Sequence, residues 1–325
     1  MTEPRTVLPS GRVQPRFAGL CTFGRYPRIE DVDASRSPVD WAIYGVPFDS
    51  AVTYRPGTRF GPRAMRDASQ YLKPYSIEHD VNIAEVLSLA DAGDAPVRPY
   101  SNEDNLKGVF EHASSIGGPE TKLLALGGDH SIAYANIRAT WERQGSPRGG
   151  LPLIHFDSHL DTVDVVWGDR WSHASPFIRA IEDGLIDPKR MVSIGIKGPL
   201  NTAADLDYAR DHGVEIITHP QWQQDGPARL ARVLDRLGTD PSYITFDIDV
   251  VDPAYAPGTG TPSHGGFTSA EVFAILRSLA GVRLAGADVV EVLPDRDVNQ
   301  NTALLAAHVA FEILCLDAVS RRTTR

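Results

Sequence analysis

Short apolar runs alternate with longer amphipathic segments through most of this chain. The runs are rich in branched aliphatic side chains and have the length of buried strands. They cover residues 41–47, 122–128, 151–157, 191–196, 214–218, 242–249 and 284–292. Segments with helical character, several of which open with a capping residue, cover residues 104–116, 131–143, 175–183, 203–212, 226–238 and 268–280. The alternation predicts an α/β fold in which helices cover both faces of a mostly parallel sheet.

The two ends of the chain depart from this pattern. Residues 302–320 are strongly apolar but carry His308, Glu312 and Asp317, so we expect a packing helix and not a membrane span. Residues 1–35 contain several Pro and Arg residues and are predicted to form an N-terminal arm that contacts a neighbouring subunit. Residues 36–325 are then predicted to form one domain.

Composition narrows the classes of partner. The 325 residues include 32 basic and 42 acidic side chains, and the net charge of −10 argues against a nucleic acid and favours a small molecule. The two cysteines, Cys21 and Cys315, suggest neither a disulfide framework nor a thiolate metal site. The N-terminus lacks an apolar stretch of signal-peptide length, so we expect a cytoplasmic protein without a membrane partner.

Metal-binding side chains occur in three short clusters, each at the carboxyl end of a predicted strand. They are His130 in GGDHS, Asp157, His159 and Asp161 in DSHLD, and Asp247 and Asp249 in FDIDVVDP. That edge of an open α/β sheet is where ligands bind. One such cluster alone would mean little, because Asp and His in loops are usually solvated. Together, four carboxylates and two imidazoles suit a pair of divalent cations such as Mn²⁺.

With these motifs the chain resembles the ureohydrolases, the family of arginases and agmatinases. The resemblance also includes GVPFDSAVTYRPGTRFGPRAMR (45–66) and DVVEVLPDRDVNQNTALLAA (288–307), which are more similar to the agmatinase and guanidinobutyrase branch than to the arginases proper. It extends over nearly the whole chain. It implies a three-layer α/β/α fold with a central sheet of about eight strands, and a homo-oligomer that is a trimer or a hexamer.

The resemblance also implies a metal centre and a reaction. One cation would be held by His130, Asp157, Asp161 and Asp247, and a second by Asp157, His159, Asp247 and Asp249. A hydroxide bridging the two cations would attack the guanidinium carbon of a small substrate and release urea and an amine. Mn²⁺ is the expected ion, and Ni²⁺ is the alternative.

Three residues are expected to be catalytic. His173 in WSHASPF would protonate the leaving amine, for which an imidazole is suited. Glu291 would hold the substrate guanidinium through a two-pronged contact, and Asp161 would accept a hydrogen bond from the hydroxide. No role is assigned to His155, His264 or His308.

Several positions near these motifs depart from the usual family pattern. Ser158 replaces an alanine and Ala174 replaces a glycine beside His173, while Val163 stands where relatives that bind an amino-acid carboxylate often have Asn. L-arginine is therefore not the expected substrate.

The loop that follows the second cluster supplies the remaining candidates for substrate binding. Trp167 and Trp171 would either pack against a short substrate or pack within the loop, and Asp164 and Arg170 would contact a polar tail.

Four functional hypotheses remain open at this point. The first is hydrolysis of a compound such as guanidinobutyrate or agmatine. The second is hydrolysis of free guanidine, a substituted guanidine or a biguanide such as metformin, with nickel. The third is an inactive subunit that pairs with an active one, although His173 and Glu291 argue against it. The fourth is a one-zinc, deacetylase-like amidohydrolase, which would not need His130 or Asp249.

Overall fold

The computed structural model describes residues 4–33, 35 and 38–323, and its centre is one sheet of eight parallel strands. In spatial order the strands are β4 (Leu89–Asp94), β1 (Trp41–Val46), β5 (Lys122–Gly127), β10 (Leu284–Val290), β9 (Ser242–Asp247), β6 (Leu151–Phe156), β7 (Ile186–Ile196) and β8 (Glu215–Thr218). From β1 the chain passes to the edge strand β4 and back to β5, continues through β6, β7 and β8 to the other edge, and finally places β9 and β10 between β5 and β6. The predicted parallel sheet is confirmed.

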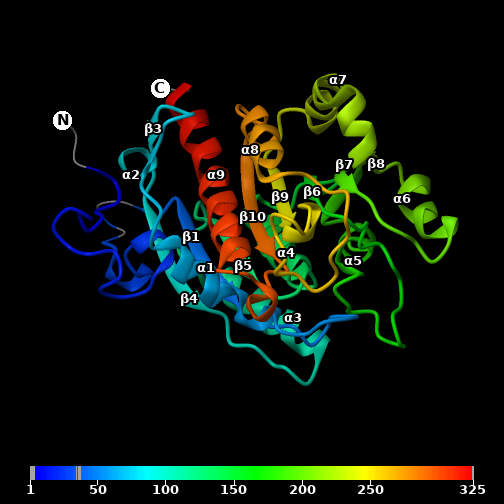
Figure 1. The fold of residues 1–325 in the computed structure, drawn as a ribbon, viewed down its shortest axis with the longest axis horizontal. Helices are drawn as coiled ribbons and strands as arrows, with labels where there is room; N and C mark the ends of the chain where they lie inside the picture. Colours follow the sequence, from blue (N-terminus) through cyan, green and yellow to red (C-terminus); the bar gives the residue numbers. More distant parts are fainter. Residues whose placement is uncertain (1–3, 34, 36–37, 324–325) are drawn as a thin grey trace.

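Helices cover both faces of this sheet (Figure 1). One layer contains α1 (Gly61–Ser69), α7 (His219–Leu237), α8 (Ser269–Ser278) and α9 (Asn301–Thr323). The other contains α3 (Asn102–Ser115), α4 (Ile132–Arg143) and α5 (Pro176–Glu182). Smaller elements are α6 (Asp207–Asp211) beside β8, and α2 (Ile83–Val86) next to the hairpin of β2 (Tyr75–Ser76) and β3 (Val81–Asn82). The three-layer architecture is as predicted.

Local sequence explains where the helices begin. Thr268 caps α8 and Thr218 caps α7, each in a capping box with the residue three positions later. The prediction for α7 began at residue 226, whereas the helix begins at His219 and contains Pro227 at a kink.

The apolar C-terminal helix α9 packs inside the molecule. It is the one helix among the described residues that is long and apolar enough to cross a membrane, but 78% of its most apolar window is buried. It contacts α1, α8 and β10, and the His308 ring lies edge-on to Phe273. These contacts are those of a core helix, as the sequence predicted.

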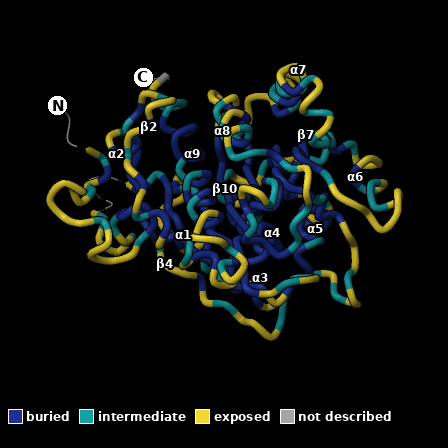
Figure 2. The backbone as a smooth tube through the Cα atoms, viewed as in Figure 1, coloured by how far each residue is buried: buried dark blue, intermediate teal, exposed yellow. Residues whose placement is uncertain are grey.

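The predicted N-terminal arm packs closely against the sheet and α1. Figure 2 shows exposed backbone in the arm and the outer loops and buried backbone in the central strands. Phe23 is fully buried, and its N–H donates to Asp91 Oδ2 at 2.7 Å. The same carboxylate pairs with Arg66 of α1, with Nε to Oδ2 at 2.8 Å and Nη2 to Oδ1 at 3.0 Å. The boundary between residues 35 and 36 stays a prediction, because residues 34, 36 and 37 lie outside the described part.

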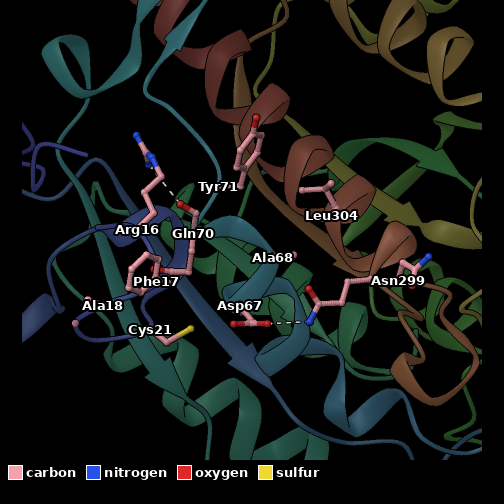
Figure 3. Close-up of a pocket in the computed structure, with 12 residues that line it drawn as sticks. Arg16, Phe17, Ala18, Cys21, Asp67, Ala68, Gln70, Tyr71, Asn299 and Leu304 are labelled. Carbon is pink, nitrogen blue, oxygen red and sulfur yellow. Dashed lines mark hydrogen bonds between the residues drawn. The ribbon is translucent and has the colours of Figure 1, made fainter. Parts of the chain in front are cut away.

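Further along the arm, residues 16–21 face α1 and the start of α9 across a cavity of about 470 Å³ (Figure 3). Arg16 Nη1 donates to the carbonyls of Gln70 at 3.3 Å and Leu72 at 2.7 Å, and Gln300 Nε2 donates to Asp67 Oδ2 at 2.9 Å. The arm is thus joined to the end of α1 by hydrogen bonds to its main chain.

Candidate metal centre and active site

The candidate site lies at the carboxyl ends of four neighbouring central strands, β5, β10, β9 and β6. His130 follows β5, Glu291 follows β10, Asp247 ends β9, and the DSHLD motif follows β6. The loop that carries His130 needs its glycines, because a Cβ at Gly128 would lie 2.0 Å from the Phe48 carbonyl oxygen. The topology therefore brings together the three motifs that the sequence singled out.

The first predicted ligand group converges on one ring nitrogen. His130 Nδ1 lies 3.1 Å from Asp157 Oδ2, 3.0 Å from Asp161 Oδ2 and 3.3 Å from Asp247 Oδ2. This nitrogen is fully buried, yet it has no hydrogen bond with suitable geometry to any described residue. One imidazole nitrogen with three carboxylate oxygens within 3.3 Å of it is a donor set that suits a divalent cation.

A buried polar chain beneath His130 fixes which of its nitrogens is free. His130 Nε2 lies 2.8 Å from Thr245 Oγ1, and the Thr245 hydroxyl donates its single proton to Asp288 Oδ1 at 2.5 Å. Thr245 Oγ1 can therefore only accept from the ring, which places the imidazole proton on Nε2. Tyr243 donates to the other Asp288 oxygen at 2.6 Å. In the neutral ring the lone pair is then on Nδ1, the nitrogen that a metal ligand would use.

The second predicted ligand group surrounds His159. Its Nδ1 lies 3.3 Å from Asp157 Oδ1 and 3.1 Å from Asp249 Oδ2. Asp157 thus presents one oxygen to each histidine, as expected of a carboxylate shared between two cations. Asp249 is fully buried, whereas the His159 side chain is 37% exposed and faces the cavity described below.

The buried aspartates of this cluster carry an excess of negative charge that bound cations would offset. Burial, together with repulsion from Asp249 and Asp157, raises the pKa of Asp247 well above its usual range. Burial and the Asp157 charge raise the pKa of Asp161 in the same way. Four aspartates in so small a buried volume are unfavourable unless cations compensate them. The donor atoms, the free His130 nitrogen and the excess negative charge all fit a pair of divalent cations.

His155, to which the sequence gave no role, holds a predicted ligand in place. It is fully buried on β6, its Nε2 lies 2.9 Å from Asp157 Oδ2, and its Nδ1 lies 3.0 Å from Ser193 Oγ. Alternation along β6 places residues 155 and 157 on the same face, and this signal in the sequence could have identified His155.

Ser158 ties two of the ligand motifs together. Its N–H donates to Asp249 Oδ1 at 3.0 Å and its hydroxyl donates to the Asp249 carbonyl oxygen at 2.7 Å. Lys197 Nζ contacts Ser158 Oγ and donates to the same carbonyl at 2.7 Å. The departure from the usual alanine therefore acts on the loops that carry the predicted ligands and not on the cavity wall.

Glu291 and His173 form a buried pair next to the cluster. Glu291 Oε1 lies 2.8 Å from His173 Nδ1 and accepts the His130 backbone N–H at 2.9 Å, whereas Oε2 is buried and has no hydrogen-bond partner among the described residues. Glu291 has a φ of 65°, a left-handed conformation that is uncommon for a residue with a side chain and clusters at functional sites. Burial disfavours the charged His173 ring, but Glu291 outweighs this effect and raises the pKa of His173 to about 9.

A cavity of about 370 Å³ opens onto the cluster. It is lined by Thr53, His159, Leu160, Asp161, Thr162, Val163, His173, Ala174, Pro199, Leu200, Asn201, Asp205, Asp247 and Thr261. Val163 and Ala174, two of the unusual residues noted in the sequence, are part of its wall. No Lys or Arg side chain is among these lining residues. Apart from the predicted ligands and His173, Asp205 is the one ionisable group on the wall.

The other four predicted substrate-binding residues lie away from this cavity. Trp167 is 81% exposed, and Trp171 packs edge-on to Tyr134 with ring centroids 5.0 Å apart. Asp164 pairs with Arg179 of α5, and Arg170 pairs with Glu182 at 3.0 Å. Trp171 thus packs against α4, and Asp164 and Arg170 pair with residues of α5. A role in substrate binding stays a prediction for Trp167, Trp171, Asp164 and Arg170.

Comparison with known proteins agrees with this geometry. The family model described as the arginase family matches residues 39–316. A guanidinopropionase of Pseudomonas aeruginosa is 41% identical over 310 residues, which are 94% of each chain. A proclavaminate amidinohydrolase of Streptomyces clavuligerus is 38% identical over 312 residues, 96% of this chain and 97% of that protein.

Solved structures give the same result. The crystal structure of the proclavaminate amidinohydrolase superimposes with a TM-score of 0.85 at 37% identity, covering 94% of this chain and all of that chain. That of a hypothetical agmatinase from Burkholderia thailandensis gives 0.86 at 36% identity, covering 100% and 97%. The match in sequence, fold and motifs confirms the resemblance. The chain belongs to the arginase family.

Proposed function

We propose that this protein is an amidinohydrolase that cleaves a small guanidino compound to urea and an amine. The observation that carries the proposal is the convergence of three carboxylate oxygens on the buried, unpartnered Nδ1 of His130, beside a second group of carboxylates at His159. Relatives that share most of their length with this chain include a guanidinopropionase, a guanidinobutyrase and an agmatinase.

The proposed ligands divide into two sets. His130, Asp157, Asp161 and Asp247 would hold one cation, and Asp157, His159, Asp247 and Asp249 the other. A pair of divalent cations bound there would supply hydroxide at neutral pH and would offset the carboxylate charge. We propose Mn²⁺, with Ni²⁺ as the alternative, because nitrogen and oxygen ligands accept both ions.

Glu291 is the proposed anchor for the guanidinium. Its Oε1 is already engaged by His130 and His173, and its buried Oε2 is free to accept an N–H of the substrate. An unpaired buried carboxylate oxygen is costly, and a charged N–H donor relieves that cost. His173 is the proposed acid, because its raised pKa keeps a proton on the ring at neutral pH for the leaving amine.

The cavity wall favours a substrate whose tail is not an anion. A carboxylate tail would meet no Lys or Arg side chain among the lining residues and would approach Asp205. The ammonium group of agmatine, or a neutral alkyl group on guanidine or a biguanide, avoids that repulsion. We therefore place agmatine and substituted guanidines ahead of guanidinobutyrate and guanidinopropionate as substrates.

Kinetics on a panel of substrates tests the proposal. Urea release would be measured from guanidine, agmatine, guanidinobutyrate, guanidinopropionate, arginine and metformin, each with Mn²⁺ and with Ni²⁺. Urea from agmatine or a substituted guanidine at a higher kcat/KM than from the two acids is expected. Folded, metal-loaded protein that released urea from none of them would refute the function, and a preference for the acids would refute only the order of substrates.

We also propose that the chain forms a homo-oligomer, a trimer or a hexamer. Val13, Phe17 and Leu20 of the arm are 71–94% exposed, and a neighbouring subunit would cover such apolar side chains. Light scattering coupled to size-exclusion chromatography measures the mass directly, and a monomer would contradict this proposal.

A further inference from the structure

Thr53 contacts the ring nitrogen of His173 that Glu291 leaves free. It lies on the loop of residues 47–57, between β1 and the short helical turn that precedes α1. The Thr53 N–H donates to His173 Nε2 at 3.0 Å, and Thr53 Oγ1 lies 2.7 Å from the same nitrogen. Glu291 occupies Nδ1 at 2.8 Å. Both nitrogens of the proposed acid are therefore engaged by protein groups.

The two Thr53 contacts suit two different protonation states of the ring. A backbone N–H can only donate, so it pairs with Nε2 when that nitrogen carries a lone pair. A hydroxyl oxygen can accept, so Thr53 Oγ1 pairs with Nε2 when the ring is protonated there. Because one residue serves both states, the ring can lose and regain a proton at Nε2 without moving.

Thr53 also faces the cavity in which the reaction is proposed to occur. Thr53 and His173 both line this cavity, and the two ring nitrogens of His173 are engaged by Thr53 and Glu291. Thr53 is thus both a lining residue of the cavity and the hydrogen-bond partner of His173 Nε2. A proton leaving Nε2 along its hydrogen bond goes to Thr53 Oγ1.

We propose that the Thr53 hydroxyl relays the proton from His173 to the leaving amine, an inference that rests on the proposed hydrolysis. As the C–N bond breaks, the amine nitrogen takes the Oγ1 proton and Oγ1 takes the proton from His173 Nε2. The ring ends neutral with its proton on Nδ1, facing Glu291, and Nε2 then accepts the Thr53 N–H. His173 regains its proton, by the reverse path, from the water that supplies the next hydroxide.

The loop is anchored firmly enough to hold this geometry. The His173 N–H donates to the Ala51 carbonyl oxygen at 3.0 Å, which ties the two segments together two residues from Thr53. On the other side, buried Asp49 accepts the Gly57 N–H at 2.7 Å. Thr53 itself is only partly buried, so replacing its side chain should not unfold the protein.

Three variants at this position test the relay. Thr53→Val keeps the shape and the backbone N–H but removes the hydroxyl, Thr53→Ser keeps the hydroxyl, and Thr53→Ala is a second variant without it. Thr239→Val, at an exposed site in the loop after α7, is the matched control. For Val and Ala, kcat on the best substrate of the panel should fall about 100-fold, the usual size of a lost acid–base step. The serine variant should keep most of the wild-type kcat, and KM, metal content and melting temperature should stay near wild type in all three.

A double variant separates a relay from a structural role. If the two residues act in one chain, Thr53→Val should add almost nothing to the loss of kcat caused by His173→Asn. Wild-type kcat in Thr53→Val, an equal loss in Thr53→Ser, or losses that multiply in the double variant would each overturn the relay. If the wild-type protein releases no urea from any guanidino compound, it is the proposed function that fails, before the variants are compared.

Discussion

Replacing Thr245 by valine should weaken metal binding at the proposed centre and lower the stability of the fold. The Thr245 hydroxyl accepts from His130 Nε2 at 2.8 Å and donates to Asp288 Oδ1 at 2.5 Å, and all three residues are fully buried. Valine has nearly the same shape, so the change removes two hydrogen bonds without opening a cavity. It also frees the His130 ring from the contact that keeps its proton on Nε2.

The magnitude follows from the groups left unpaired. A buried donor or acceptor without a partner costs about 1–3 kcal/mol, so loss of both Thr245 contacts should lower the free energy of unfolding by about 2–6 kcal/mol. Removing the hydrogen-bond partner of a metal-ligating histidine typically lowers metal affinity about 10- to 100-fold. The variant should therefore bind its first cation more weakly while keeping every proposed ligand.

Thr140→Val supplies the matched control. Thr140 of α4 is also a buried threonine, but its hydroxyl has no hydrogen-bond partner among the described residues, so valine should be neutral or stabilising there. Thermal unfolding of metal-free protein and competition titration with a coloured chelator would measure stability and affinity in both variants. Equal metal affinity in Thr245→Val and Thr140→Val would refute the claim that this polar chain sets the state of His130.

Three further outcomes are expected. Arg66→Met should lower the free energy of unfolding by about 3–5 kcal/mol, because it leaves the Asp91 carboxylate buried without its ion pair and weakens the contact of Asp91 with Phe23. Thermal unfolding measures this loss. A loss under about 1 kcal/mol would show that the arm does not depend on this pair. Ser158→Ala should lower the free energy of unfolding by about 1 kcal/mol in the same assay, because Ser158 joins the two loops that carry the proposed ligands. The order of preferred substrates should not change, since Ser158 does not line the cavity. An altered order would contradict that placement. Removing metal with a chelator should lower the melting temperature, because a ligand at 100 times its Kd stabilises a fold by about 2.7 kcal/mol. Calorimetry measures the melting temperature. No shift on chelation would argue against a bound pair of cations.

Much of the fold was predictable because its signals are local. Apolar runs identified seven of the eight strands of the sheet, because most of these strands are buried on both faces and are continuously apolar. The exception, β4, reads LADAGD and lies at an edge of the sheet, where half of it is not buried. The start of β7 was predicted five residues too late, since the strand begins at Ile186. Helix α1 was missed because its sequence, GPRAMRDAS, has few apolar residues, and its contacts with α9 decide its structure.

The candidate site divides in a similar way. Its proposed ligands were visible because they occur in short motifs at strand ends, where the topology of a parallel sheet brings them together. Among the residues that support them, Thr245 and Asp288 were not visible, because they are ordinary strand residues and the contacts of Thr245 with Asp288 and His130 span 43 and 115 positions. Thr53 depends in the same way on a contact 120 positions away, with His173. Such pairs exist only in the folded chain. His155 is different, because it lies two positions from Asp157 and strand alternation could have identified it.

Urea release measured against metal added to the metal-free protein tests the central claim most directly. The account predicts no urea without metal, and activity that rises with added Mn²⁺ or Ni²⁺ until it levels off at two ions per chain. Full activity at one ion per chain, activity without metal, or no urea from any guanidino compound at saturation would contradict it.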